Sequence, residues 1–137
     1  MLQLLIGKKG TGKTKVLISN VNDAAKSAQG NVVFISNNIS QNMYDITSKV
    51  RMTDTSEFDI ASWDEFLGFI CGIISGNFDI TNIFVDGTLK IVKNSMDGFE
   101  NFLTSIEALG KKFDIDFELS VSIDANDAPE YIKKYVK

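Results

Sequence analysis

The stretch Gly7-Lys8-Lys9-Gly10-Thr11-Gly12-Lys13-Thr14 decides the fold of this 137-residue chain. It matches the pattern G-x-x-x-x-G-K-[ST] at every fixed position. The apolar run Leu2–Ile6 comes directly before it and predicts a buried strand. Residues 14–28 follow with apolar side chains at helical spacing and predict an amphipathic helix. This order of strand, glycine-rich turn and helix is typical of a loop that holds a phosphate group.

The chemistry of phosphate binding explains the residue types in this loop. Glycines let the main chain approach the phosphate and take up positive φ. The N–H groups then form an anion nest, to which the following helix adds its positive end. Lys13 is placed to reach β- and γ-phosphate oxygens, and the Thr14 hydroxyl to bind a magnesium ion that bridges them. The candidate binding residues are Gly7, Lys8, Lys9, Gly10, Thr11, Gly12, Lys13, Thr14 and Lys15. Lys8 and Lys9 occupy variable positions, where they either strengthen the positive field or are simply solvated.

Strand-like and helix-like segments alternate along the rest of the chain. Further strands are predicted at 31–36, 80–85 and 117–123, and a short edge strand at 49–53. Further helices are predicted from the capping box Ser62–Glu65 to about Ser75, at 95–112, and from a cap at Asp127 onward. This alternation predicts a parallel sheet flanked by helices, with ligands at the carboxyl ends of its strands.

A second chemical signal follows the strand at 80–85, which ends in Asp86. A carboxylate at a strand end near a phosphate loop can hold magnesium, usually through water. On its own the pattern is equally typical of an Asp-Gly turn. Together with the upstream loop it predicts a metal site made by Thr14 and Asp86.

The two motifs resemble Walker A and Walker B of the P-loop NTPases, and the chain looks like small single-domain bacterial ATP-binding proteins. Some of these carry the label of a twitching motility ATPase. The resemblance implies one nucleotide-binding domain over residues 1–137, with ATP or GTP and Mg²⁺ as cofactors. It also implies a three-layer αβα fold with a mainly parallel sheet of four to five strands. A RecA-like order is favoured, in which the strand at 117–123 lies beside the first and Ser122 resembles a sensor of the γ-phosphate.

The departures from this family pattern concern hydrolysis. Gly87 and Thr88 follow Asp86 where many ATPases have a glutamate, and the second strand ends in Ser36-Asn37-Asn38. The acids Asp54, Glu57 and Asp59 are interpreted as solvated loop residues. Arg51, the single arginine, would serve as an arginine finger only if its segment covered the site. No N-K-x-D guanine motif occurs.

These features favour ATP binding with slow or no intrinsic hydrolysis, in a nucleotide-dependent switch or a subunit of an assembly. Two alternatives stay open. One is an active ATPase completed in trans by a neighbouring copy or a partner. The other is a non-catalytic interaction domain that retains the loop as a scaffold.

Composition excludes several other classes. The chain has no histidine and one cysteine, which excludes His-based catalysis and an internal disulfide framework. Its net charge of −4 and pI near 4.8 disfavour nucleic acid as a partner. The longest apolar run, Phe66–Ile74, is too short to span a membrane. The expected setting is therefore cytoplasmic, with a nucleotide and either a second copy or another protein as partners.

Two further expectations concern packing. Gly68, Gly72 and Gly76 recur every four residues in an apolar helix, which predicts burial on two sides, a buried Cys71 and a core Trp63. A self-association seam is the alternative for the glycine face. In the strand at 117–123 apolar residues alternate with polar ones, which predicts a half-exposed strand at an edge and leaves the strand order open.

Overall fold

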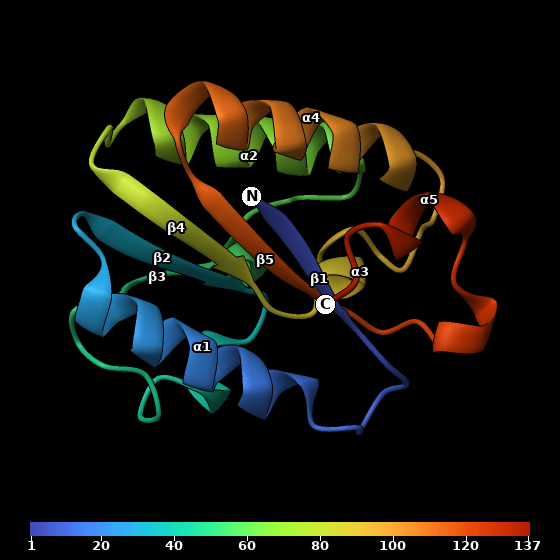
Figure 1. The fold of residues 1–137 in the computed structure, drawn as a ribbon, viewed down its shortest axis with the longest axis horizontal. Coiled ribbons are helices and arrows are strands. Elements are labelled where there is room, and N and C mark those ends of the chain that lie inside the picture. Colours follow the sequence, from blue (N-terminus) through green and yellow to red (C-terminus); the bar gives the residue numbers. More distant parts are fainter.

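The computed structural model describes residues 1–137 and contains one sheet of five parallel strands (Figure 1). The strands are β1 (Leu2–Ile6), β2 (Asn31–Ser36), β3 (Arg51–Asp54), β4 (Ile80–Val85) and β5 (Asp116–Val121). Their order is β1-β5-β4-β2-β3, and every neighbouring pair is parallel. The expected RecA-like order is thus confirmed, because β5 pairs with β1 and separates it from β4.

Helices cover both faces of the sheet, which confirms the three-layer αβα architecture. Helix α1 (Lys13–Ser27) packs on one face, and α2 (Trp63–Ser75) and α4 (Phe99–Phe113) pack on the other (Figure 1). Two short helices, α3 (Thr88–Ile91) and α5 (Glu130–Lys133), follow β4 and β5. Single 3-10 turns lie at Ile39–Gln41, Thr55–Glu57 and Ala125–Asp127. No helix combines the length and the apolar character that crossing a bilayer requires.

The two faces bury very different cores. The face under α2 and α4 holds a cluster of 25 buried apolar residues, whereas the α1 face holds a cluster of seven. Trp63 belongs to the larger cluster, as predicted, where its ring stacks on Phe99 and its Nε1 donates to the Ser95 carbonyl. The larger core stabilises the sheet from one side. Helix α1, which follows the phosphate loop directly, packs on the opposite face.

β5 corrects the expectation of a half-exposed edge strand. It lies inside the sheet, and Glu118 and Ser120 are only 7% and 2% exposed. Both polar side chains have hydrogen-bond partners in the protein, which for Ser120 are Asp86 and the Gly87 amide. Glu118 accepts a hydrogen bond from Asn20 of α1 at 2.7 Å and pairs with Lys137 at 3.2 Å. The alternation therefore reports buried hydrogen bonding and not exposure to solvent.

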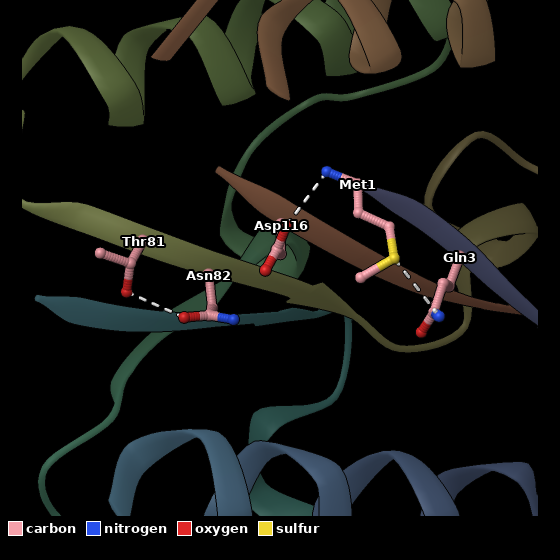
Figure 2. A network of polar contacts seen from close by, with 5 residues as sticks. All are labelled: Met1, Gln3, Thr81, Asn82 and Asp116. Atoms are coloured by element: carbon pink, nitrogen blue, oxygen red, sulfur yellow. Dashed lines mark hydrogen bonds and ion pairs between the residues drawn. The ribbon is translucent and has the colours of Figure 1, made fainter. Parts of the chain in front are cut away.

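Other polar contacts hold the amino ends of the strands, away from the phosphate loop (Figure 2). The N-terminal ammonium group pairs with Asp116 at 3.0 Å, and Gln3 donates to the sulfur of Met1 at 3.6 Å. Thr81 donates to Asn82 at 2.8 Å. The ion pair of Met1 with Asp116 joins the starts of β1 and β5, whereas the other two contacts each lie within one strand or directly beside it.

The glycine face of α2 is a second correction. A Cβ built at Gly68 or Gly72 meets no atom within 4 Å, and Cys71 is exposed. The helix therefore packs on one side only, and the expected second covered side and buried cysteine are wrong. Its start is as predicted, because Ser62 accepts from the Glu65 amide and Glu65 in turn accepts from the Ala61 amide.

Several element boundaries also differ from those expected. The helix predicted from residue 95 begins at Phe99, because Gly98 takes φ 94° and a turn separates it from α3. Asp127 does not cap a helix: it ends the turn at Ala125–Asp127, and Pro129 occupies the cap position of α5. The short edge strand is confirmed as β3, displaced by one or two residues.

Candidate functional site

The phosphate loop joins the end of β1 to the start of α1. Gly10 and Gly12 have φ values of 83° and 88°, the left-handed region that other residues rarely adopt. Gly12 occupies the cap position of α1 and provides no side-chain acceptor for the first amides of the helix. The first N–H groups of a helix lack partners within the helix, and they lie at its N-terminus, which carries a partial positive charge. The loop thus has the geometry of an anion site.

The side chains of Lys13 and Thr11 both donate to the main-chain carbonyl of Lys8, within the same loop. Lys13 Nζ donates to the Lys8 carbonyl at 2.8 Å, and Thr11 Oγ1 donates to the same oxygen at 2.7 Å. A Cβ at Gly7 would lie 2.7 Å from Thr11 Oγ1, so this turn has no room for a side chain there. Burial lowers the pKa of the Lys13 ammonium below its ordinary value; Asp86 opposes the shift, and Lys90 adds to it.

Thr14 and Asp86 meet across the sheet, as the two motifs predict. Thr14 Oγ1 lies 3.2 Å from both carboxylate oxygens of Asp86. Ser120 of β5 donates to Asp86 at 2.7 Å and accepts from the Gly87 amide at 2.8 Å. Because β5 lies between β1 and β4, its serine fixes the carboxylate that faces the phosphate loop. Sequence reasoning missed Ser120; its polarity within a buried strand was the available signal.

A cavity of about 290 Å³, called here the phosphate cavity, opens between these groups. No apolar side chain lines it. Four lysines do, namely Lys9, Lys13, Lys15 and Lys90, against a single carboxylate, Asp86. None of the four lysines has a carboxylate within 4 Å. The cavity is therefore locally cationic on a protein of net charge −4.

Lys90 is the second residue that sequence reasoning missed. It lies in α3, a single helical turn that follows Asp86-Gly87 directly, so Lys90 comes four residues after the carboxylate. Gly87 has φ 62° and caps this turn. A lysine one turn beyond a strand-end aspartate is the signal that could have identified it.

The remaining candidates lie around this cavity in different ways. Ser122 lines it, in agreement with its expected position. Lys8 turns away and pairs with Asp124 at 3.4 Å, and Thr11 faces the Lys8 carbonyl. Gly7 lies in the turn behind Thr11. Of the binding residues predicted from the sequence, Lys9, Gly10, Gly12, Lys13, Thr14 and Lys15 line the cavity.

The groups considered for hydrolysis are absent from the phosphate cavity. Arg51 pairs with Val33 in the middle of β2 and lines a hollow beside Gly72 and Gly76 of α2, so it does not reach the loop. Asp54 accepts from the Ser56 amide, and Glu57 is exposed. Asp59 lines a neighbouring cavity.

The donor set fits magnesium with few protein ligands. No cluster of three or more acidic, cysteine or histidine side chains is present. Thr14 and Asp86 instead offer a hydroxyl and a carboxylate side by side, and Mg²⁺ prefers oxygen ligands and keeps several from water and phosphate. A phosphate chain in the cavity would complete such a set.

Comparisons with known proteins support the fold. Neither a protein-family model nor a curated protein matches the sequence. Among solved structures, the chain is similar to a KaiC-like protein of the hyperthermophilic archaeon Pyrococcus horikoshii OT3, with a TM-score of 0.64 and 15% identity. The match covers 96% of this chain and spans 65% of the length of that chain. This similarity establishes an α/β fold like that of a KaiC-like, RecA-type domain.

Proposed function

We propose that residues 1–137 form one nucleotide-binding domain that holds ATP with Mg²⁺ in the phosphate cavity. The observation that carries the proposal is the contact of Thr14 with Asp86 beside four lysines without ion-pair partners. The lysines and the free amides of the loop supply the attraction for a polyphosphate. Thr14 and Asp86 supply oxygen ligands for its metal, and the metal when bound would neutralise and orient the phosphates.

We further propose that hydrolysis is slow or absent and that the domain serves as a nucleotide-dependent switch or as a subunit of an assembly. Asp86 is the only carboxylate that lines the phosphate cavity, and it already accepts from Thr14 and Ser120. No arginine lines the cavity. The chain alone thus lacks both a group to activate water and the arginine that would stabilise transferred phosphoryl charge.

Calorimetry and turnover measurements test these two statements separately. Titration with MgATP, MgGTP and each nucleotide in EDTA should show binding that depends on the metal. Turnover per chain should stay near the background rate at every protein concentration. Specific activity that rises with concentration would instead indicate an ATPase completed in trans, and absence of binding to any triphosphate would indicate a scaffold loop.

A further inference from the structure

A second cavity of about 340 Å³ adjoins the phosphate cavity at the carboxyl ends of β2 and β3. Lys90 lines both cavities. Along the sheet edge the order is phosphate loop, Asp86 after β4, Asn37 after β2, and Thr55 after β3. If the nucleotide binds as proposed above, the second cavity therefore lies on the side of Asp86 that faces away from the phosphate loop.

The walls of this second cavity combine cationic and apolar groups. Lys90 and Lys93 line it, neither has a carboxylate within 4 Å, and Asp59 is the only acid in the wall. Phe58, Ile60 and Ile91 form the apolar part. Phe58 is 56% exposed and its ring rests on Phe69 at 5.4 Å between ring centres, so an exposed aromatic residue forms part of the cavity wall.

One buried polar group in the wall lacks a partner. Thr55 is 3% exposed, and its hydroxyl has no hydrogen-bond partner in the protein. The turn after α3 is also unusual, because Lys93 and Asn94 take φ values of 58° and 63°. This left-handed turn places Lys93 at the cavity.

We propose that the second cavity binds a small organic anion, distinct from the nucleotide and adjacent to its phosphates. Lys90 and Lys93 hold its charged group, and Phe58, Ile60 and Ile91 hold an apolar body. The volume suits a small molecule of this kind. The position beside the phosphates rests on the proposed function, whereas the anion site itself does not.

The test is a titration with phenyl phosphate of the full chain saturated with MgADP. Binding of this probe is monitored by amide NMR. We expect shifts in residues 55–61 and 90–93 and tighter binding than for inorganic phosphate. Lys93→Gln should lower the affinity for phenyl phosphate about fivefold, because an exposed ion pair changes affinity by about this factor. The affinity for MgADP should stay unchanged. Lys90→Gln should weaken both ligands. Lys112→Gln, on the far end of α4, is the control and should weaken neither.

A second variant addresses the apolar wall. Phe58→Ala should weaken the probe a few-fold while the protein stays folded, because it removes an exposed aromatic ring from the cavity wall. The proposal is overturned by shifts confined to residues 10–15, by absence of shifts, or by an affinity that is unchanged in either Lys93→Gln or Phe58→Ala. Failure of MgADP to bind would refute the proposed function alone, since the probe titration still reports on the second cavity.

Discussion

The phosphate cavity and the second cavity share Lys90 but are built in different ways. One continuous loop supplies six of the eleven residues that line the first cavity, which has no apolar wall. The second is made of side chains from three separate segments, after β2, after β3 and in α3, and has a mixed wall. A site built from one loop is visible as a motif, whereas one assembled from three segments emerges only when the sheet brings them together.

The largest expected effect is a loss of affinity at the phosphate cavity that leaves the second cavity unchanged. Lys13→Ala should weaken MgATP about 100-fold, because it removes charge-assisted hydrogen bonds to two phosphate groups. Binding of phenyl phosphate to the second cavity should stay within about twofold of wild type. Calorimetry with both ligands measures this contrast. Retention of MgATP affinity in a folded variant would disprove the role given to Lys13.

Asp86→Asn tests separately whether magnesium contributes to binding in the phosphate cavity. Affinity for MgATP should fall about tenfold, since a carboxylate ligand is lost, while affinity for ATP in EDTA should hold or rise because a negative charge is removed. Asp124→Asn, at a carboxylate that pairs with Lys8 outside the cavity, is the matched control. An equal loss with and without magnesium would contradict the metal role.

Replacing glycine by alanine should change the free energy of unfolding in opposite directions in the phosphate loop and in helix α2. Gly12→Ala should cost about 1 kcal/mol of unfolding free energy, because φ 88° is strained for alanine although space is free. Gly68→Ala should add about 0.5–1 kcal/mol, because it lies inside α2 and its Cβ meets no atom. Urea unfolding followed by Trp63 fluorescence measures both. Equal effects of the two changes would show that the loop conformation is wrong.

The pH dependence of binding is the smallest effect. Because burial lowers the pKa of Lys13, its ammonium loses charge at a lower pH than an ordinary lysine does. Affinity for MgATP should therefore fall as the pH is raised through the alkaline range. In Lys13→Arg, where the charge persists, the same titration should be flatter. A steeper fall in the arginine variant would contradict this cause.

Sequence reasoning predicted the elements whose signals are local. The limits of β1, β2 and β4 follow from apolar runs that end at turn residues, and the Ser62 cap follows from a four-residue pattern. The pairing of Thr14 with Asp86 could be predicted because both motifs end at the same edge of a parallel sheet.

The misses depended on tertiary partners. Alternation in β5 indicated an exposed face, but Asn20, Lys137 and Asp86 satisfy its polar side chains inside the protein. The spacing of Gly68 and Gly72 gave no indication whether a neighbour covers that face, and none does. Lys90 lies in α3, a turn too short to leave a periodic pattern, and the second cavity forms only where this turn meets the segments after β2 and β3.

We expect the loop amides and lysines to hold the phosphates of a nucleotide together with its metal. Amide NMR of the full chain during a titration with MgADP tests this expectation most directly. We predict saturable shifts in residues 10–15 and 86–90, smaller in EDTA. A spectrum of folded protein in which these resonances stay unchanged at millimolar MgADP would contradict the account.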